Sequence, residues 1–158
     1  MTADARPVGH GLYWEEFPLG FKFHTFGRTI TEADLVGFIN ATGFNEILFT
    51  DTEYLKTGSL IKGRLVPAML VYGISEGLMV PAMQGTGLAF FNATIDVKGP
   101  TFVNDTIHVE GEVIETRRTS KGDNGLVRTM NSVINQHGKT VLTYNPLRMI
   151  KGRDAKSS

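Results

Sequence analysis

The loop at residues 44–50 joins two predicted helices and holds the residue types best suited to acid–base chemistry. Glu46 could act as a lone general base, and Asn45 could orient a water molecule beside it. The alternative is a solvated pair of loop side chains. Phe44 and Phe49 flank this pair and could form the floor of an apolar pocket for an acyl or aromatic group, the alternative being ordinary core aromatics. The loop therefore supplies two catalytic candidates, Asn45 and Glu46, next to an apolar binding surface.

A second chemical feature is the start of a predicted helix at Pro67-Ala68. Proline is tolerated at the first helical position because the N–H groups of the first turn have no partner inside the helix. Ala68 therefore offers a free N–H, and the helix dipole favours negative charge at this end. We expect a carbonyl oxygen, a carboxylate or a buffer anion to bind near Ala68 and the adjoining Met69.

The remaining chemical groups do not converge in the sequence. His24, His108 and His137 fall in separate predicted strands or turns without ligand spacing, and there are no cysteines, so no metal site is predicted. The basic group Arg117, Arg118 and Lys121 could meet the phosphates of a ligand, or it is a solvated turn. The segment 85–87 lacks the strand–glycine–helix order of a dinucleotide site, and no cofactor is predicted.

Composition excludes several classes of protein. The chain has 158 residues with 16 basic and 16 acidic side chains, and this balance argues against a nucleic-acid-binding protein. Its apolar runs are too short to span a membrane, and no basic–apolar leader opens the chain. We therefore expect a soluble cytoplasmic protein made of one domain, 1–158, with a loose arm at 1–12 and a disordered tail at 152–158.

Three predicted helices position the candidate site residues. Thr31 is a suitable N-cap, with acidic residues in the next turn, and it begins a helix that Thr42-Gly43 ends. A short helix follows Asp51 and stops at Gly58. The segment from Ala68 to Val80 is apolar on almost every side, which is typical of a buried helix, and Pro81 is expected to end it.

Strands make up most of the rest of the chain. Alternating or apolar segments bounded by turns predict strands at 21–30, 88–97, 106–118, 126–136 and 139–150. Helices segregated from a run of antiparallel strands indicate an α+β fold. One long apolar helix with a single curved sheet predicts the hotdog arrangement, in which the sheet wraps the helix. Because one sheet leaves a flank of that helix uncovered, we expect a homodimer or a multiple of it.

Several of these segments together resemble the MaoC-like dehydratases. The matching residues are Thr29-Ile30-Thr31-Glu32-Ala33-Asp34, Phe38, Thr42-Gly43, Asp51, Met69-Leu70, Gly99-Pro100, Val103-Asn104-Asp105-Thr106 and Asn135-Gln136-His137-Gly138. The resemblance runs from about Trp14 to Lys151. It implies a hotdog protein similar to the (R)-specific enoyl-CoA hydratases, which add water to, or remove it from, an acyl thioester carried on CoA or a carrier protein.

The resemblance also implies where catalysis should occur, and there this chain departs from the family. The family's Asp and His share an activated water, but Phe44 (or Gly43, in a register shifted by one residue) and Phe49 stand at those positions. The family's His-Gly, whose N–H holds the thioester oxygen, is replaced by Pro67-Ala68, in which Ala68 keeps its N–H.

The sequence therefore predicts a MaoC-like protein that binds an acyl thioester and lacks the standard hydratase activity. Two alternatives stay open. One is a thioesterase on the same fold, with Glu46 or Asp51 as base and the Ala68 N–H as oxyanion donor. The other is a non-catalytic binding or interaction subunit, because a fold alone does not determine function.

Overall fold

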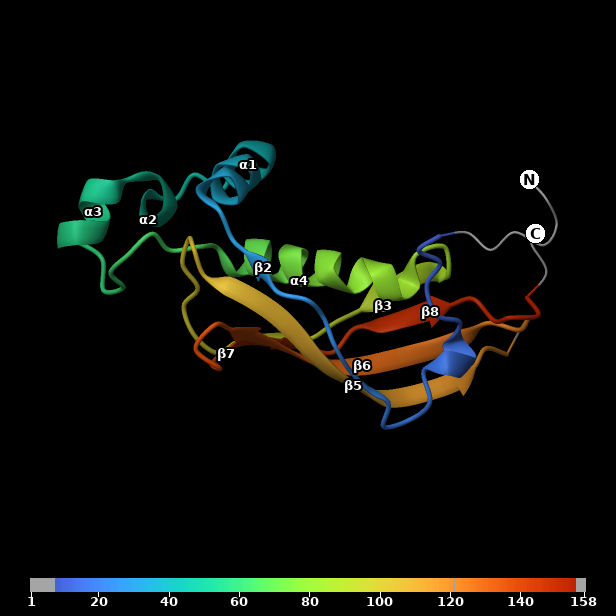
Figure 1. Ribbon diagram of the computed structural model, residues 1–158. Helices are drawn as coiled ribbons and strands as arrows, with labels where there is room; N and C mark the ends of the chain where they lie inside the picture. The colour runs from blue at the N-terminus through green and yellow to red at the C-terminus, as the bar shows by residue number, and fades with distance from the viewer. Residues whose placement is uncertain (1–7, 121, 156–158) are drawn as a thin grey trace.

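The chain folds as one long helix lying along a curved antiparallel sheet. The computed structural model describes residues 8–120 and 122–155. Helix α4 (Ala68–Met83) runs along the concave side of the sheet, and three shorter helices gather beyond its N-terminal end (Figure 1). The sheet does not close into a barrel. The predicted α+β hotdog arrangement, a sheet wrapped around one central helix, is therefore confirmed.

Helix α4 continues past the residue that was expected to end it. The prediction stopped at Val80, but the helix includes Pro81 and reaches Met83. A proline one turn from the end removes one helical hydrogen bond and leaves few residues beyond it to be disturbed. The last carbonyl groups are satisfied from outside the helix, because Leu12 and Gly11 donate N–H bonds to Ala82 O (2.9 Å) and Gln84 O (2.8 Å).

The end segments of the chain differ from the loose termini that we predicted. Gly11 is buried and Leu12 packs in the smaller core cluster, so the part of the arm next to the domain is held against α4. In the tail, Arg153 pairs with Glu16 at 2.8 Å, and its guanidinium stacks on the Tyr13 ring. Residues 1–7 and 156–158, which complete the predicted arm and tail, lie outside the described residues.

The short helices follow the capping chemistry of the sequence. Helix α1 (Glu32–Thr42) begins at Thr31, whose side chain accepts the Asp34 N–H while Asp34 caps the Thr31 N–H in return. Gly43 ends it with a positive φ of 70°. Asp51 caps α3 (Thr52–Thr57). The predicted loop at 44–50 in fact contains one turn of helix, α2 (Ile47–Thr50).

Within the described residues the sheet contains eight strands, because three of the five predicted strands are each interrupted. The strands are β1 (Lys22–His24), β2 (Arg28–Thr29), β3 (Gly87–Asn92), β4 (Ile95–Val97), β5 (Thr106–Arg118), β6 (Gly125–Asn135), β7 (Thr140–Tyr144) and β8 (Leu147–Ile150). Strands β5 and β6 lie at the centre, β1 and β2 share one edge, and β4 and β3 share the other. The two long central strands were predicted almost to the residue.

Each interruption has a local cause. Between β1 and β2, the Thr25 hydroxyl accepts the Val109 N–H at 2.9 Å and takes the place of a strand carbonyl. Between β7 and β8, Pro146 has no N–H to donate to a ladder. The break between β3 and β4 lies opposite this one, where Thr94 and Asn145 exchange backbone and side-chain bonds. Both neighbouring strands therefore break at the same level, which allows the sheet to bend around α4.

A group of polar side chains is buried beneath the middle of α4. Glu76 of the helix forms an ion pair with Arg148 of β8, and Phe90 of β3 lies 5.8 Å from the guanidinium. Asn131 and Tyr144 lie opposite one another on β6 and β7, with exposed fractions of 0% and 1%. Burial, together with the nearby Glu76 carboxylate, raises the pKa of Tyr144 above its ordinary value.

The residues that the structure describes contain no helix that is both long and apolar enough to cross a membrane.

The ion pair between Glu76 and Arg148 leads us to a prediction about stability. Replacing Arg148 with methionine (Arg148→Met) leaves the Glu76 carboxylate without its partner, and the free energy of unfolding should fall by about 3 kcal/mol. Denaturant unfolding measures this change. Arg118→Met, which breaks an exposed pair with Asp123, is the matched control and should cost less than about 1 kcal/mol. Equal losses in the two variants would contradict a structural role for the buried pair.

Candidate functional site

A largely apolar cavity lies against the N-terminal end of α4. Its volume is about 210 Å³. The residues that line it are Phe49, Ile61, Leu65, Val66, Ala68, Val71, Val97, Gly99, Pro100, Thr101, Val141 and Leu142. Thr101 alone among these has a polar side chain. The cavity therefore suits the hydrocarbon part of a ligand, which leaves water when it enters.

Helix α2 supplies Phe49 to this cavity, and three further chain segments form the rest of its wall. The segment before α4 is joined to residues 101–103 by a Val66 N–H to Thr101 O bond of 2.9 Å and by a bridge between Leu65 and Phe102. Strand β7 adds the third wall, since Lys98 donates its N–H to Val141 O at 2.9 Å. Backbone bonds thus fix all three walls relative to the start of α4.

Ala68 stands at the first helical position and lines the cavity. Pro67, just before it, is extended (φ −57°, ψ 135°), and its carbonyl accepts the N–H groups of Leu70 (3.0 Å) and Val71 (3.2 Å). Within the described residues, no backbone carbonyl accepts the N–H groups of Ala68 or Met69. An unpaired N–H at the positive end of a helix can donate to a carbonyl oxygen or an anion.

The sequence candidates do not all reach this cavity. Phe49 and Ala68 line it, whereas the Met69 side chain lies on the exposed surface of α4. Phe44 is 40% exposed and supports the cavity only indirectly, with its ring centroid 5.6 Å from that of Phe49. We expected both phenylalanines to form an apolar wall of the site. Of the two, Phe49 lies in the cavity lining and Phe44 does not.

The polar candidates lie outside the cavity. Asn45 and Glu46 are both exposed, and the Glu46 carbonyl accepts the Phe49 N–H at 2.8 Å to begin α2. The Asp51 carboxylate is occupied as a helix cap, accepting the N–H groups of Glu53 (2.9 Å) and Tyr54 (3.0 Å). None of the three carboxyl or amide side chains contributes to the cavity lining. The structure thus separates the acid–base candidates from the apolar pocket.

Arg64 is a positioning residue that the sequence analysis missed. Its guanidinium donates to the Glu32 carboxylate, with Nε 3.0 Å from both oxygens, and to the carbonyl oxygen of Phe49. This contact joins α1 and α2 at the cavity wall. Hydrogen bonding and charge from Arg64 hold the pKa of Glu32 below its usual value. A lone arginine in a linking segment carries no periodic signal, so its role depends on the folded contacts.

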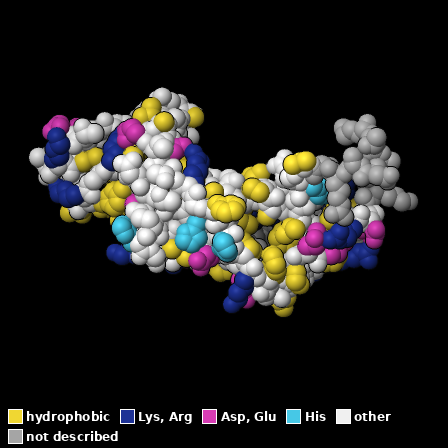
Figure 2. Space-filling view, in the orientation of Figure 1, with side chains coloured by type: hydrophobic (Ala, Val, Ile, Leu, Met, Phe, Trp, Pro, Cys, Tyr) yellow, Lys and Arg dark blue, Asp and Glu magenta, His cyan; other side chains and the backbone are white. Residues whose placement is uncertain are grey.

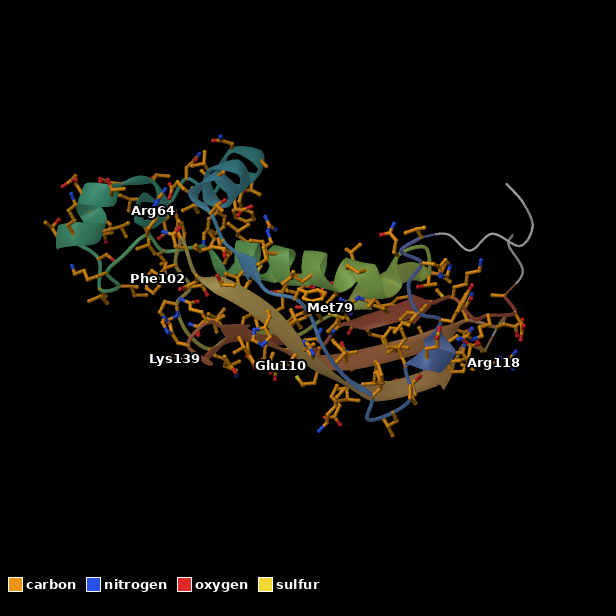
Figure 3. All side chains as sticks on the ribbon, viewed as in Figure 1. Arg64, Met79, Phe102, Glu110, Arg118 and Lys139 are labelled. Carbon is orange, nitrogen blue, oxygen red and sulfur yellow. The ribbon has the colours of Figure 1, made fainter. Side chains whose placement is uncertain are left out.

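The basic group proposed for ligand phosphates lies at the opposite end of the molecule. Arg118 projects at the far end of the sheet from Arg64 and Phe102 (Figure 3). It pairs with Asp123, and Arg117 pairs with Glu115. Lys121, the third member, lies outside the described residues. This group therefore cannot serve a ligand held in the cavity.

Side chains able to bind a metal ion lie apart from one another in the described part of the chain. No group of three or more His, Asp or Glu side chains able to hold a metal ion occurs among residues 8–120 and 122–155. His108 contacts Glu110, and His137 contacts Gln136. The space-filling view shows histidines spread along one face of the molecule, with hydrophobic side chains along the line of α4 (Figure 2).

Comparison with known sequences finds distant relatives that act on CoA thioesters. No family model matches the chain. A mesaconyl-CoA hydratase from Cereibacter sphaeroides is 25% identical over 146 residues, 91% of this chain and 42% of the relative. A 3-hydroxybutyryl-CoA dehydratase from Methylorubrum extorquens is 22% identical over 104 residues, 66% of this chain and 65% of the relative. The chain thus spans less than two thirds of the length of each of these curated relatives.

Solved structures share the fold over most of the chain. A monoamine oxidase regulatory protein from Archaeoglobus fulgidus is 28% identical, with a TM-score of 0.81 and coverage of 90% of this chain and 96% of its own. An R-hydratase from Pseudomonas aeruginosa is 25% identical, with a TM-score of 0.75. The match covers 90% of this chain and 88% of the R-hydratase chain. A double hotdog protein from Mycobacterium tuberculosis has a TM-score of 0.82 at 19% identity and covers 97% of this chain and 48% of its own.

The helix-wrapping sheet, the motif residues and the relatives agree with one another. This chain is a hotdog-fold protein that resembles the MaoC-like dehydratases and R-hydratases.

Proposed function

We propose that the protein binds an acyl thioester, such as an acyl-CoA, at the N-terminal end of α4. The observation that carries this proposal is an apolar cavity whose lining includes Ala68, a residue whose N–H is bound by no backbone carbonyl of the described residues. The acyl chain enters the cavity between Phe49 and Val141, and the thioester oxygen accepts the Ala68 N–H. A volume of about 210 Å³ is smaller than a typical drug-sized site, so it accommodates a short acyl group and not the whole ligand.

We infer that this binding is not coupled to the standard hydration chemistry. A hydratase needs a base and an acid on one water molecule, and phenylalanine side chains at positions 44 and 49 supply neither. Among the residues lining the cavity, none carries a carboxyl or imidazole group. The function that fits these residues is a MaoC-like acyl-CoA-binding protein.

Two alternatives remain as proposals of lower rank. A thioesterase would need Glu46 or Asp51 as base, yet Glu46 is exposed and does not line the cavity, and Asp51 caps α3. A non-catalytic subunit that pairs with an active relative is consistent with the missing acid and base. The two are distinguished by assaying thioester cleavage by the chain alone.

We propose that two copies of the chain associate through the uncovered flank of α4 and the edge of the sheet. Met69 and Val80 are 43% and 47% exposed on α4, and between them Gly73 and Gly77 have open space where a side chain would lie. On edge strand β3, Phe90 and neighbouring apolar residues are about half exposed. Apolar surface of this extent on adjoining elements favours association with a partner.

The Ala68 N–H can be removed without altering the backbone. Ala68→Pro places proline at the first helical position, after a residue whose ψ of 135° is compatible with a following proline. Binding of butyryl-CoA, measured by titration calorimetry, should weaken by about 1–3 kcal/mol, the usual loss of a hydrogen-bond donor to a strongly polar acceptor. Thermal stability should change little.

Ala68→Val is the matched control, because it adds comparable bulk to the cavity wall and keeps the N–H. If both variants weaken binding equally, the effect comes from volume and not from the lost hydrogen bond. If Ala68→Pro binds as well as the parent, the ligand lies elsewhere.

A second prediction concerns turnover. The purified protein should show no measurable hydration of crotonyl-CoA, because loss of one general acid or base usually costs about 10²–10⁴-fold in rate and both are replaced here. The loss of absorbance of the enoyl thioester on hydration measures this directly. A rate within tenfold of that of an active R-hydratase assayed in parallel would contradict the prediction.

The third prediction concerns assembly. Light scattering at micromolar concentration should return twice the 17.4 kDa mass of one chain, or a multiple of that dimer. Gly77→Leu, which fills the open flank of α4, should shift the population toward the monomer. A mass of about one chain for the parent protein would refute the proposed dimer.

A further inference from the structure

Among the described residues that line the apolar cavity, Thr101 alone has a polar side chain. Its exposed fraction is 4%, and within the described part of the chain no hydrogen bond reaches its hydroxyl. A buried hydroxyl without a partner costs free energy, and most such groups in folded proteins are paired. An ordered water needs about two to four polar partners, and no other side chain of this lining offers one. The unpaired hydroxyl therefore points to a partner carried by a ligand.

Its position distinguishes this hydroxyl from other unpaired threonine hydroxyls of the core. Thr86 and Thr129 have exposed fractions of 0% and 4%, and their hydroxyl oxygens are sealed from solvent without a partner. Neither residue lines the cavity. The Thr101 oxygen is not one of these sealed atoms, and Thr101 does line the cavity. A ligand in the cavity can therefore reach the hydroxyl of Thr101 and not those of Thr86 and Thr129.

Backbone contacts on both sides hold Thr101 in place. Its carbonyl accepts the N–H of Val66, which lies just before α4, at 2.9 Å. The next residue, Phe102, forms a bridge to Leu65 and donates its N–H to the Asp105 carboxylate at 2.8 Å. The hydroxyl is thus attached to a backbone that is fixed before any ligand enters, which lowers the ordering cost of binding.

We propose that Thr101 is a specificity-determining residue, which selects acyl groups bearing a neutral hydroxyl or keto oxygen over hydrocarbon chains of the same shape. The inference rests on the proposed function and names the class of acyl group that the cavity takes. A threonine hydroxyl can donate a hydrogen bond to a keto oxygen, and it can donate to or accept from a ligand hydroxyl. A hydrocarbon chain offers neither, so its binding leaves the Thr101 hydroxyl buried and unpaired.

The other lining residues limit the substituent to a neutral one. No charged side chain lines the cavity, and a carboxylate buried there would have no cation beside it. Phe49, Val71 and Leu142 are apolar and suit the hydrocarbon part of the acyl group. Thr101 thus fixes one oxygen atom of an acyl group that is otherwise held by apolar contacts.

The experiment compares pairs of acyl-CoA ligands in which a methyl group replaces a hydroxyl. The pairs are 3-hydroxybutyryl-CoA with 3-methylbutyryl-CoA and 2-hydroxybutyryl-CoA with 2-methylbutyryl-CoA, each enantiomer being titrated separately by calorimetry. The parent protein should bind at least one hydroxy compound about tenfold more tightly than its methyl counterpart, because the ligand hydroxyl pairs with Thr101. A hydroxyl that finds no partner in an apolar cavity would lose affinity instead, so the sign of the difference is decisive.

Thr101→Val keeps the shape of the side chain and removes its hydroxyl. This variant should reverse the preference, so that the methyl compound of the same pair binds about tenfold more tightly than the hydroxy compound. The matched control is Thr129→Val, which removes an equally buried, unpaired hydroxyl away from the cavity. It should leave the ranking of the ligands as in the parent.

The comparison in the parent protein needs no variant, so it decides even where a variant fails to fold. Methyl compounds that bind as tightly as the hydroxy compounds in both pairs would overturn the role of Thr101 and leave the acyl site intact. A hydroxy preference that survives Thr101→Val, or that Thr129→Val removes equally, would also overturn it. Failure of every acyl-CoA to bind would reject the proposed function itself.

Discussion

The packing of α4 into the concave face of the sheet is the constraint on which the other features of the molecule depend. The helix buries four apolar side chains, Leu70, Val71, Ile74 and Met79, each contributing about 1.5–3 kcal/mol through removal from water. A flat sheet could not contact so much of one helix. The breaks at Thr94 and Asn145 bend the edge strands at one level, so that the sheet curves around the helix.

The same packing creates the candidate site. Burial of α4 holds its N-terminal end against residues 97–101 and β7, where backbone bonds to Thr101 and Val141 fix the surrounding walls. The helix supplies an unpaired N–H at Ala68, and the walls supply apolar surface. Binding of a thioester oxygen thus requires no catalytic side chain. The proposed acyl site therefore does not depend on a general acid or base.

The middle of α4 is joined to the sheet by an ion pair. Glu76 places a largely buried carboxylate against the sheet, where Arg148 of β8 neutralises it. Tyr144 and Asn131 lie beside this pair in the interior. A buried ion pair contributes little net stability compared with apolar packing, but it strongly disfavours any arrangement that separates its members. The pair therefore fixes the position of α4 along strand β8.

The sequence by itself determined those features that depend on neighbours along the chain. Alternation predicted β5 and β6, the Thr31–Asp34 capping box predicted the start of α1, and the apolar run after Pro67 predicted α4. These signals are local, since periodicity and capping act within a few residues. The family resemblance, carried by short motifs spread over the chain, also followed from the sequence.

Only the tertiary structure decided which residues meet. The cavity joins residues 61–71, 97–101 and 141–142, and nothing in their spacing connects them. Asn45 and Glu46 are close to Phe49 in the sequence, yet they lie outside the cavity because α2 turns Phe49 inward and leaves them exposed. Arg117 and Arg118 are adjacent basic residues that lie far from the cavity, whereas pairing of β4 with β7 places Val97 opposite Leu142 in the cavity wall. The physical reason is that strand pairing brings together positions about forty residues apart, a distance over which no local pattern in the chain carries information.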